Sequence, residues 1–145
     1  MKFTFSVAVI VGLALPAFVA HWAVSAQPTQ SVWDGIYTAE QAKRGEQLYL
    51  QRCASCHGSD LTGGETAPGL ADGQFRSNWD GISVGDLFER IRISMPQDGP
   101  ASLTRQQYAD VVAFLFFKSD FPAGKTELPT RTEVLRQIAF KAAKP

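Results

Sequence analysis

The sequence predicts an all-α fold of three or four helices joined by one long functional loop. Apolar residues recur at helical spacing behind capping residues, and no segment shows a convincing alternation of apolar and polar residues. Between Gly58 and Ser83 the chain is rich in glycine turns and poor in periodic apolar residues. A loop of this length inside a small domain is unusual unless it wraps a bound group.

The first helix is expected to follow Thr38, which with Gln41 forms a capping box, and to run into Cys53. Residues at helical spacing in it are Ala39, Ala42, Gly45, Leu48 and Tyr49. A second helix is expected to begin at Ser83. It should end at Met95, because the proline that follows disfavours helix for the residue before it.

The third expected helix has the strongest periodicity. Thr104 and Gln107 form a capping box, and the helix should continue to about Lys118. Its apolar stripe comprises Tyr108, Val111, Val112, Leu115 and Phe116. Thr130 with Glu133 then predicts the cap of a short last helix.

The N-terminus has the pattern of a secretory signal. Lys2 precedes an apolar run over 3–20, and Val24 and Ala26 are small residues at −3 and −1 of a cut after Ala26. The alternative is an uncleaved membrane anchor, since the run is nearly long enough to span. The expected organisation is a signal peptide (1–26), a linker (27–36), one domain (37–119) and a C-terminal extension (120–145).

Charge and composition exclude two classes of protein. The chain has 14 basic and 14 acidic residues, which excludes a nucleic-acid binder that relies on net positive charge. Its 45% hydrophobic and 19% charged content argues against a mainly disordered chain. Cleavage after Ala26 would leave 13 basic and 14 acidic residues, a net charge of −1.

The segment Cys53-Ala54-Ser55-Cys56-His57 is a C-x-x-C-H motif, the attachment signature of c-type haem. Residues i and i+3 share a helical face, so both thiols can form thioethers with the two vinyl groups of one haem. The adjacent His57 then places an imidazole nitrogen on the iron. One haem c, covalently attached through Cys53 and Cys56, is therefore the expected cofactor.

The motif has three other possible interpretations. A structural zinc site needs four ligands, and after cleavage the chain has no Cys or His beyond Cys53, Cys56 and His57. A thioredoxin-like dithiol requires a βαβ context that the sequence does not show. The third is a chance occurrence of the motif.

Met95 is the candidate for the sixth iron ligand. It is the only Met after the expected cleavage site, and it lies 38 residues after His57, beyond the long loop. His/Met ligation raises the reduction potential and suits electron transfer, whereas an open position permits gas binding or peroxide chemistry. The alternative is a Met that fills a gap in the core.

Over roughly residues 37–119 the sequence resembles a class I cytochrome c. The resemblance implies the class I fold, with three to four helices wrapped around one covalently attached haem. It is carried by an ordered set comprising Gly45, Tyr49, Cys53, Cys56, His57, Pro68, Trp79, Met95, Pro96 and the last amphipathic helix.

The resemblance also implies roles for residues around the haem. The Pro68 carbonyl would accept a hydrogen bond from the second imidazole nitrogen of His57, and Leu70 would pack on the haem face. Trp79 and Arg76 would hydrogen-bond a propionate. The alternatives are a simple turn at Pro68, a core role for Trp79 and a solvated Arg76.

Two helices are expected to cross closely, as in this family. Gly45 would allow the close approach, and Tyr49 would pack near Tyr108, Val111 or Val112.

The sequence departs from the family pattern at two places. Ser94 stands before Met95 where the family often has Gly, and about 26 residues follow the usual last helix. The segment 121–129 resembles tails of cytochromes that accompany bacterial quinoprotein dehydrogenases. The alternative is a tail that covers apolar surface with Phe121, Leu128 and Leu135.

These observations predict an exported, periplasmic one-electron carrier that is not itself an enzyme. Expected partners are redox proteins, with a periplasmic dehydrogenase as donor and an oxidase or another cytochrome as acceptor. No nucleic acid is expected, and a membrane only if the N-terminal segment is uncleaved. The alternatives are a cytochrome subunit of a larger dehydrogenase complex, and a ligand-binding or peroxidatic haem protein if Met95 is not on the iron.

Overall fold

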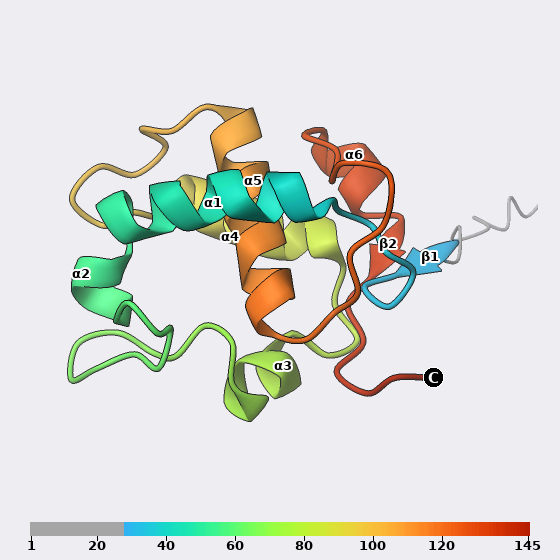
Figure 1. The fold of residues 1–145 in the computed structure, drawn as a ribbon, viewed down its shortest axis with the longest axis horizontal. Helices are drawn as coiled ribbons and strands as arrows, with labels where there is room; N and C mark the ends of the chain where they lie inside the picture. The colour runs from blue at the N-terminus through green and yellow to red at the C-terminus, as the bar shows by residue number, and fades with distance from the viewer. Residues whose placement is uncertain (1–27) are drawn as a thin grey trace, which may run out of the picture.

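The computed structural model describes residues 28–145, so the predicted signal segment lies outside the described residues. The all-α prediction is confirmed, and Figure 1 shows the arrangement of the helices. The helices are α1 (Ala39–Arg52), α2 (Ala54–His57), α3 (Gly73–Trp79), α4 (Val84–Ser94), α5 (Arg105–Lys118) and α6 (Thr132–Leu135). In the described part of the chain, no helix is long and apolar enough to span a membrane.

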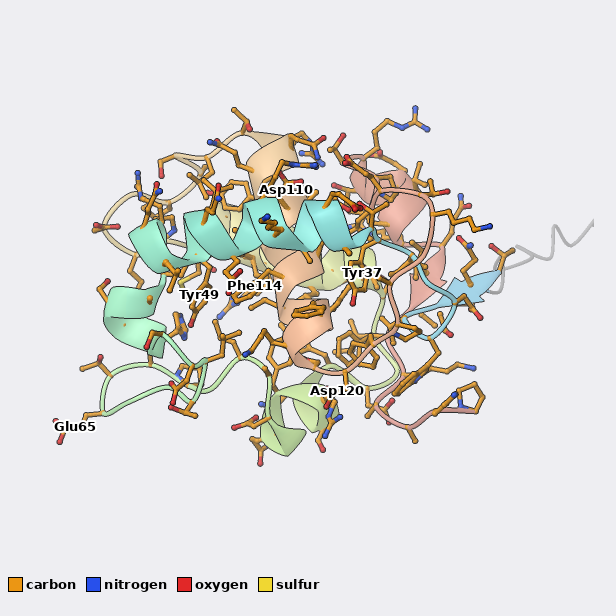
Figure 2. All side chains as sticks on the ribbon, in the orientation of Figure 1. Tyr37, Tyr49, Glu65, Asp110, Phe114 and Asp120 are labelled. Carbon is orange, nitrogen blue, oxygen red and sulfur yellow. The ribbon has the colours of Figure 1, made fainter. Side chains whose placement is uncertain are left out.

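Helix α1 crosses α5 at Gly45, as predicted (Figure 1). A Cβ atom at Gly45 would overlap the backbone carbonyl of Asp110, so only glycine permits this approach. The Tyr49 ring packs against Phe114 with ring centroids 5.3 Å apart (Figure 2). Phe114 was not among the predicted neighbours of Tyr49, which were Tyr108, Val111 or Val112 on the same helix.

The start of α1 shows only half of the predicted capping box. The Thr38 side chain accepts a hydrogen bond from the Gln41 N–H, as expected. The Gln41 side chain does not return to Thr38. It is fully buried, where its amide nitrogen donates a hydrogen bond to the Leu128 carbonyl and its amide oxygen accepts one from the Leu128 N–H. The Gln41 amide, which the local pattern assigned to the helix cap, therefore binds the backbone of the distant residue Leu128 instead.

The predicted cap of α5 is confirmed and that of α6 is wrong by one residue. Thr104 and Gln107 form the complete capping box, with both hydrogen bonds present. Helix α6 begins at Thr132 with Arg131 as its N-cap, and no side chain caps it. The Thr130 carbonyl instead accepts a hydrogen bond from the side chain of Arg105.

Helix α3 lies inside the segment between Gly58 and Ser83, which the sequence pattern predicts to be a loop. Asp72 caps it by accepting a hydrogen bond from the Phe75 N–H at 2.7 Å. Phe75 is buried and packs edge-on against Phe140, with ring centroids 6.1 Å apart. One buried side chain in seven residues gives no helical periodicity, which is why the sequence pattern missed it.

The expected linker and the C-terminal extension both pack against the domain. Strands β1 (Gln30–Ser31) and β2 (Ile138–Ala139) form a parallel pair, and Val32 beside β1 is fully buried. The extension buries Phe121, Leu128, Leu135, Ile138 and Phe140. It therefore covers apolar surface of the domain, in agreement with the interpretation of the segment as a covering tail. These strands lie at the opposite end of the molecule from α2 (Figure 1).

Candidate functional site

A cavity of about 700 Å³ opens between the end of α1, α2, the long loop and the end of α4. Seven of the eight predicted site residues line it: Cys53, Cys56, His57, Pro68, Leu70, Trp79 and Met95. The eighth, Arg76, is not among the lining residues. Its guanidinium donates a hydrogen bond to the Ser119 carbonyl at 3.4 Å. The structure thus brings together all predicted residues except this arginine.

The C-x-x-C-H motif forms a turn at the junction of α1 and α2. The Cys53 N–H ends α1 by donating to the Tyr49 carbonyl, and the N–H groups of Cys56 and His57 both donate to the Cys53 carbonyl. Burial raises the pKa of the Cys53 thiol to about 11. This thiol is therefore protonated at neutral pH, unlike the activated thiolate of a dithiol oxidoreductase.

The His57 imidazole is fixed by one backbone carbonyl. Its Nδ1 atom lies 2.8 Å from the Pro68 oxygen, and the residue is 7% exposed. A carbonyl oxygen only accepts, so Nδ1 carries the proton and the Nε2 lone pair is free to bind a metal. Such a second partner orients the ring and raises its basicity as a ligand.

Gly63 allows the loop to bring the Pro68 carbonyl to this position. It has φ +80°, and a Cβ atom on it would lie 2.6 Å from the Pro68 carbonyl carbon. The Gly63 N–H donates to the His57 carbonyl at 2.9 Å, and the Gly64 N–H donates to Ala67 at 2.9 Å. The loop is thus folded back on the histidine that it orients.

Met95 ends α4 and lines the same cavity as His57. Its N–H donates to the Ile91 carbonyl at 2.8 Å, which closes the last turn. Its own carbonyl accepts a hydrogen bond from the Tyr108 hydroxyl at 2.8 Å. The backbone that carries the thioether is therefore tied to both α4 and α5.

Sequence reasoning missed two arginines that line the cavity, Arg52 and Arg90. Arg52 directly precedes the C-x-x-C-H motif, and its guanidinium donates to the Ser102 hydroxyl at 3.3 Å. Arg90 lies five residues before Met95 on α4. Arginine suits the recognition of carboxylates such as haem propionates. Each arginine lies within five residues of a residue predicted to hold the haem, and this proximity in sequence could have identified both.

The lining residues fit a covalently bound haem. They provide two thiols, one imidazole with a free Nε2 and one thioether. The cavity volume is within the range of small-molecule and cofactor sites. Its wall also includes apolar side chains, among them Leu70, Leu87, Val111 and Leu115.

The helical fold, the C-x-x-C-H turn and this cavity define a class I c-type cytochrome, a haem protein of electron transport. Residues 40–115 match the family model described as cytochrome C oxidase, cbb3-type, subunit III. That match covers more than half of the chain, and the chain belongs to this family of c-type cytochromes.

One relative and one solved structure are also similar to this chain. Over 88 residues the chain is 29% identical to cytochrome c-551 of Bacillus subtilis, covering 61% of this chain and 76% of that protein. The crystal structure of the sulfane dehydrogenase SoxCD from Paracoccus pantotrophus is similar with a TM-score of 0.50 and 21% identity. The similarity covers 90% of this chain and 67% of the matched one. At this identity it shows a shared fold.

Proposed function

We propose that the chain is an exported monohaem cytochrome that carries one electron at a time, with His57 and Met95 as axial ligands of the haem iron. One observation carries the proposal. The His57 ring is oriented by the Pro68 carbonyl so that Nε2 is free, and Met95 lines the same cavity.

In this proposal Cys53 and Cys56 attach the haem, which supplies the one-electron chemistry. The protein holds both axial ligands, excludes water and tunes the iron through the His57–Pro68 hydrogen bond. Electron transfer requires no general base and no substrate pocket, so no residue is assigned a catalytic role and the protein is not itself an enzyme.

We assign the propionates to Trp79 together with Arg52 and Arg90, in place of Arg76. The first three line the cavity, whereas the recorded hydrogen bond of Arg76 goes to Ser119 outside it. Leu70 would pack on the haem face.

We propose that the protein acts in the periplasm with redox proteins as partners. A dehydrogenase would donate electrons, and an oxidase or another cytochrome would accept them. The signal pattern supports export, and the similarity to a structure named as a dehydrogenase is compatible with such a donor. A net charge of −1 after cleavage predicts weak steering, so the rate of electron transfer should change little with salt.

The C-terminal extension bears on the alternative of a subunit within a larger complex. Its large apolar side chains, Phe121, Leu128 and Phe140 among them, are buried in the domain itself. Deleting 120–145 would therefore expose the core as well as remove any attachment. A subunit interface on this segment would have to use its exposed residues, and substitutions there would test it without exposing the core.

Visible spectra of the matured protein test the proposal, recorded oxidised and reduced, with and without carbon monoxide. We expect a low-spin spectrum with the weak far-red band of Met–iron ligation and no reaction with carbon monoxide. Met95→Leu, which keeps the apolar volume and removes the sulfur, should lose that band and bind carbon monoxide. A wild-type protein that behaves like this variant would favour the ligand-binding or peroxidatic alternative.

Mass spectrometry of the same sample tests two finer points. One covalent haem and a chain that begins at Gln27 are expected. A second haem would overturn the monohaem assignment, and an intact Met1 would overturn cleavage.

A further inference from the structure

The Tyr108 hydroxyl joins the two ends of the loop that follows Met95. Tyr108 lies in the first turn of α5 and is 1% exposed. Its hydroxyl donates to the Met95 carbonyl at 2.8 Å and accepts a longer bond of 3.5 Å from the Leu103 N–H. The buried hydroxyl thus donates one hydrogen bond and accepts another, and both partners belong to the same loop, residues 95–103.

The same loop has few other connections to the domain. Internally, Gly99 donates to the Pro96 carbonyl and Ser102 donates to the Gly99 carbonyl. Arg52, at the end of α1, reaches Ser102 from outside. Met95 itself is held by two hydrogen bonds, from its own N–H to the Ile91 carbonyl within α4 and from the Tyr108 hydroxyl to its carbonyl, and only the second comes from outside its own helix.

Tyr108 does not line the cavity, although Val111 and Leu115 of the same helix do. Its link to the candidate iron ligand is the hydrogen bond to the Met95 carbonyl. The role open to Tyr108 is therefore to position Met95, which differs from the roles of the residues assigned as iron ligands or as packing against the haem.

We propose that Tyr108 is a positioning residue that holds the Met95 backbone and thereby sets how often the thioether leaves the haem iron. The inference rests on the proposed function, because it requires Met95 as the sixth ligand. The physical cause is that the thioether can leave the iron only if the backbone that carries it moves. The Tyr108 hydrogen bond raises the free energy that this movement costs, so the sulfur should leave more often when the bond is removed.

The test is Tyr108→Phe, which removes one oxygen and keeps the ring. The measured quantity is the rate at which the oxidised protein binds imidazole, at concentrations where dissociation of Met95 limits that rate. We expect the limiting rate to rise by about five- to tenfold, as for the loss of one buried hydrogen bond. The far-red band should persist in the absence of imidazole.

Tyr37→Phe is the matched control. Tyr37 is fully buried outside the cavity, and its hydroxyl also donates to a backbone carbonyl, that of Phe121 at 2.6 Å. This variant should lose stability to a similar extent and leave the limiting imidazole rate unchanged. A purely structural role of Tyr108 predicts the same rate for both variants.

The outcomes separate the inference from the proposed function. If the wild-type protein lacks the far-red band, Met95 is not an iron ligand, and the proposed function and the positioning role of Tyr108 are both overturned. A wild-type protein with the band, but with Tyr108→Phe within twofold of its limiting rate, overturns the positioning role alone. An equal rise in Tyr37→Phe also overturns it, because general loosening of the fold then explains the effect.

Discussion

Gly45 meets the backbone carbonyl of Asp110 so closely that a Cβ atom would overlap the oxygen. Beside this contact, the Arg44 guanidinium binds both carboxylate oxygens of Asp110, at 3.1 and 3.0 Å. The close approach brings α1, which leads into the haem attachment turn, against α5, which contributes Val111 and Leu115 to the cavity wall. The crossing therefore positions two sides of the site relative to each other.

Gly45→Ala should lower the free energy of unfolding by about 3 kcal/mol or more, because backbone must move to admit the methyl group. Denaturant unfolding of the matured protein measures this. Gly73→Ala is the control, since a Cβ atom there meets nothing within 4 Å. It should be neutral or slightly stabilising. Equal effects of the two variants would show that loss of glycine flexibility matters and the close crossing does not.

Gln41→Leu should lower the free energy of unfolding by about 2 to 4 kcal/mol, because the buried N–H and carbonyl of Leu128 both lose their partner. It should also make the segment 120–145 more sensitive to protease. Gln47→Leu is the control, on an exposed position of the same helix. If the extension is cleaved equally fast in both variants, Gln41 does not hold it.

Glu89 predicts a specific acid dependence of stability. Hydrogen bonds from Arg92, with further donors on Thr132 and Arg105, lower the pKa of this carboxyl from 4.5 to about 2. A lowered pKa in the folded state gives stability that is complete above the unfolded pKa and is lost as pH falls from about 4.5 toward 2. Over this window the wild type should lose about 1 to 2 kcal/mol more than Glu89→Gln.

Glu133→Gln serves as the control for Glu89. It removes an equal charge from an exposed position that forms no ion pair among the described residues. Unfolding curves between pH 2 and pH 6 would compare the three proteins. Parallel acid dependence of the wild type and Glu89→Gln would contradict a role of the Glu89 cluster.

Gly63→Ala should raise the reduction potential, on the order of tens of millivolts. The new methyl group would displace the Pro68 carbonyl from His57. A less basic imidazole then stabilises the oxidised iron less. Gly81→Ala has a similar positive φ and open space around the new atom, so it controls for backbone strain. A potential that shifts equally in both variants, or not at all in Gly63→Ala, would refute this explanation.

Sequence patterns predicted most of the helices because they depend on residues three or four positions apart. Thr38 and Thr104 are N-caps in the structure, as predicted, and α4 begins one residue after the expected Ser83, which is its N-cap. The weak helix around Phe75 was missed because its burial depends on Phe140, which lies 65 residues further along the chain. The segment before Tyr37 was predicted to be a linker because the strand that it pairs with lies near the C-terminus, too far along the chain for a local pattern to show.

The sequence by itself determined the chemistry of this protein. Two cysteines and the adjacent histidine are set by residue type and short spacing, and this C-x-x-C-H motif is the attachment signature of c-type haem. The tertiary structure alone decided which arginines face the cavity and which group holds the Met95 backbone. It also directed Gln41 to Leu128, 87 residues away, instead of to its own helix cap. Such pairings arise from packing between distant segments, and no local pattern of residues encodes them.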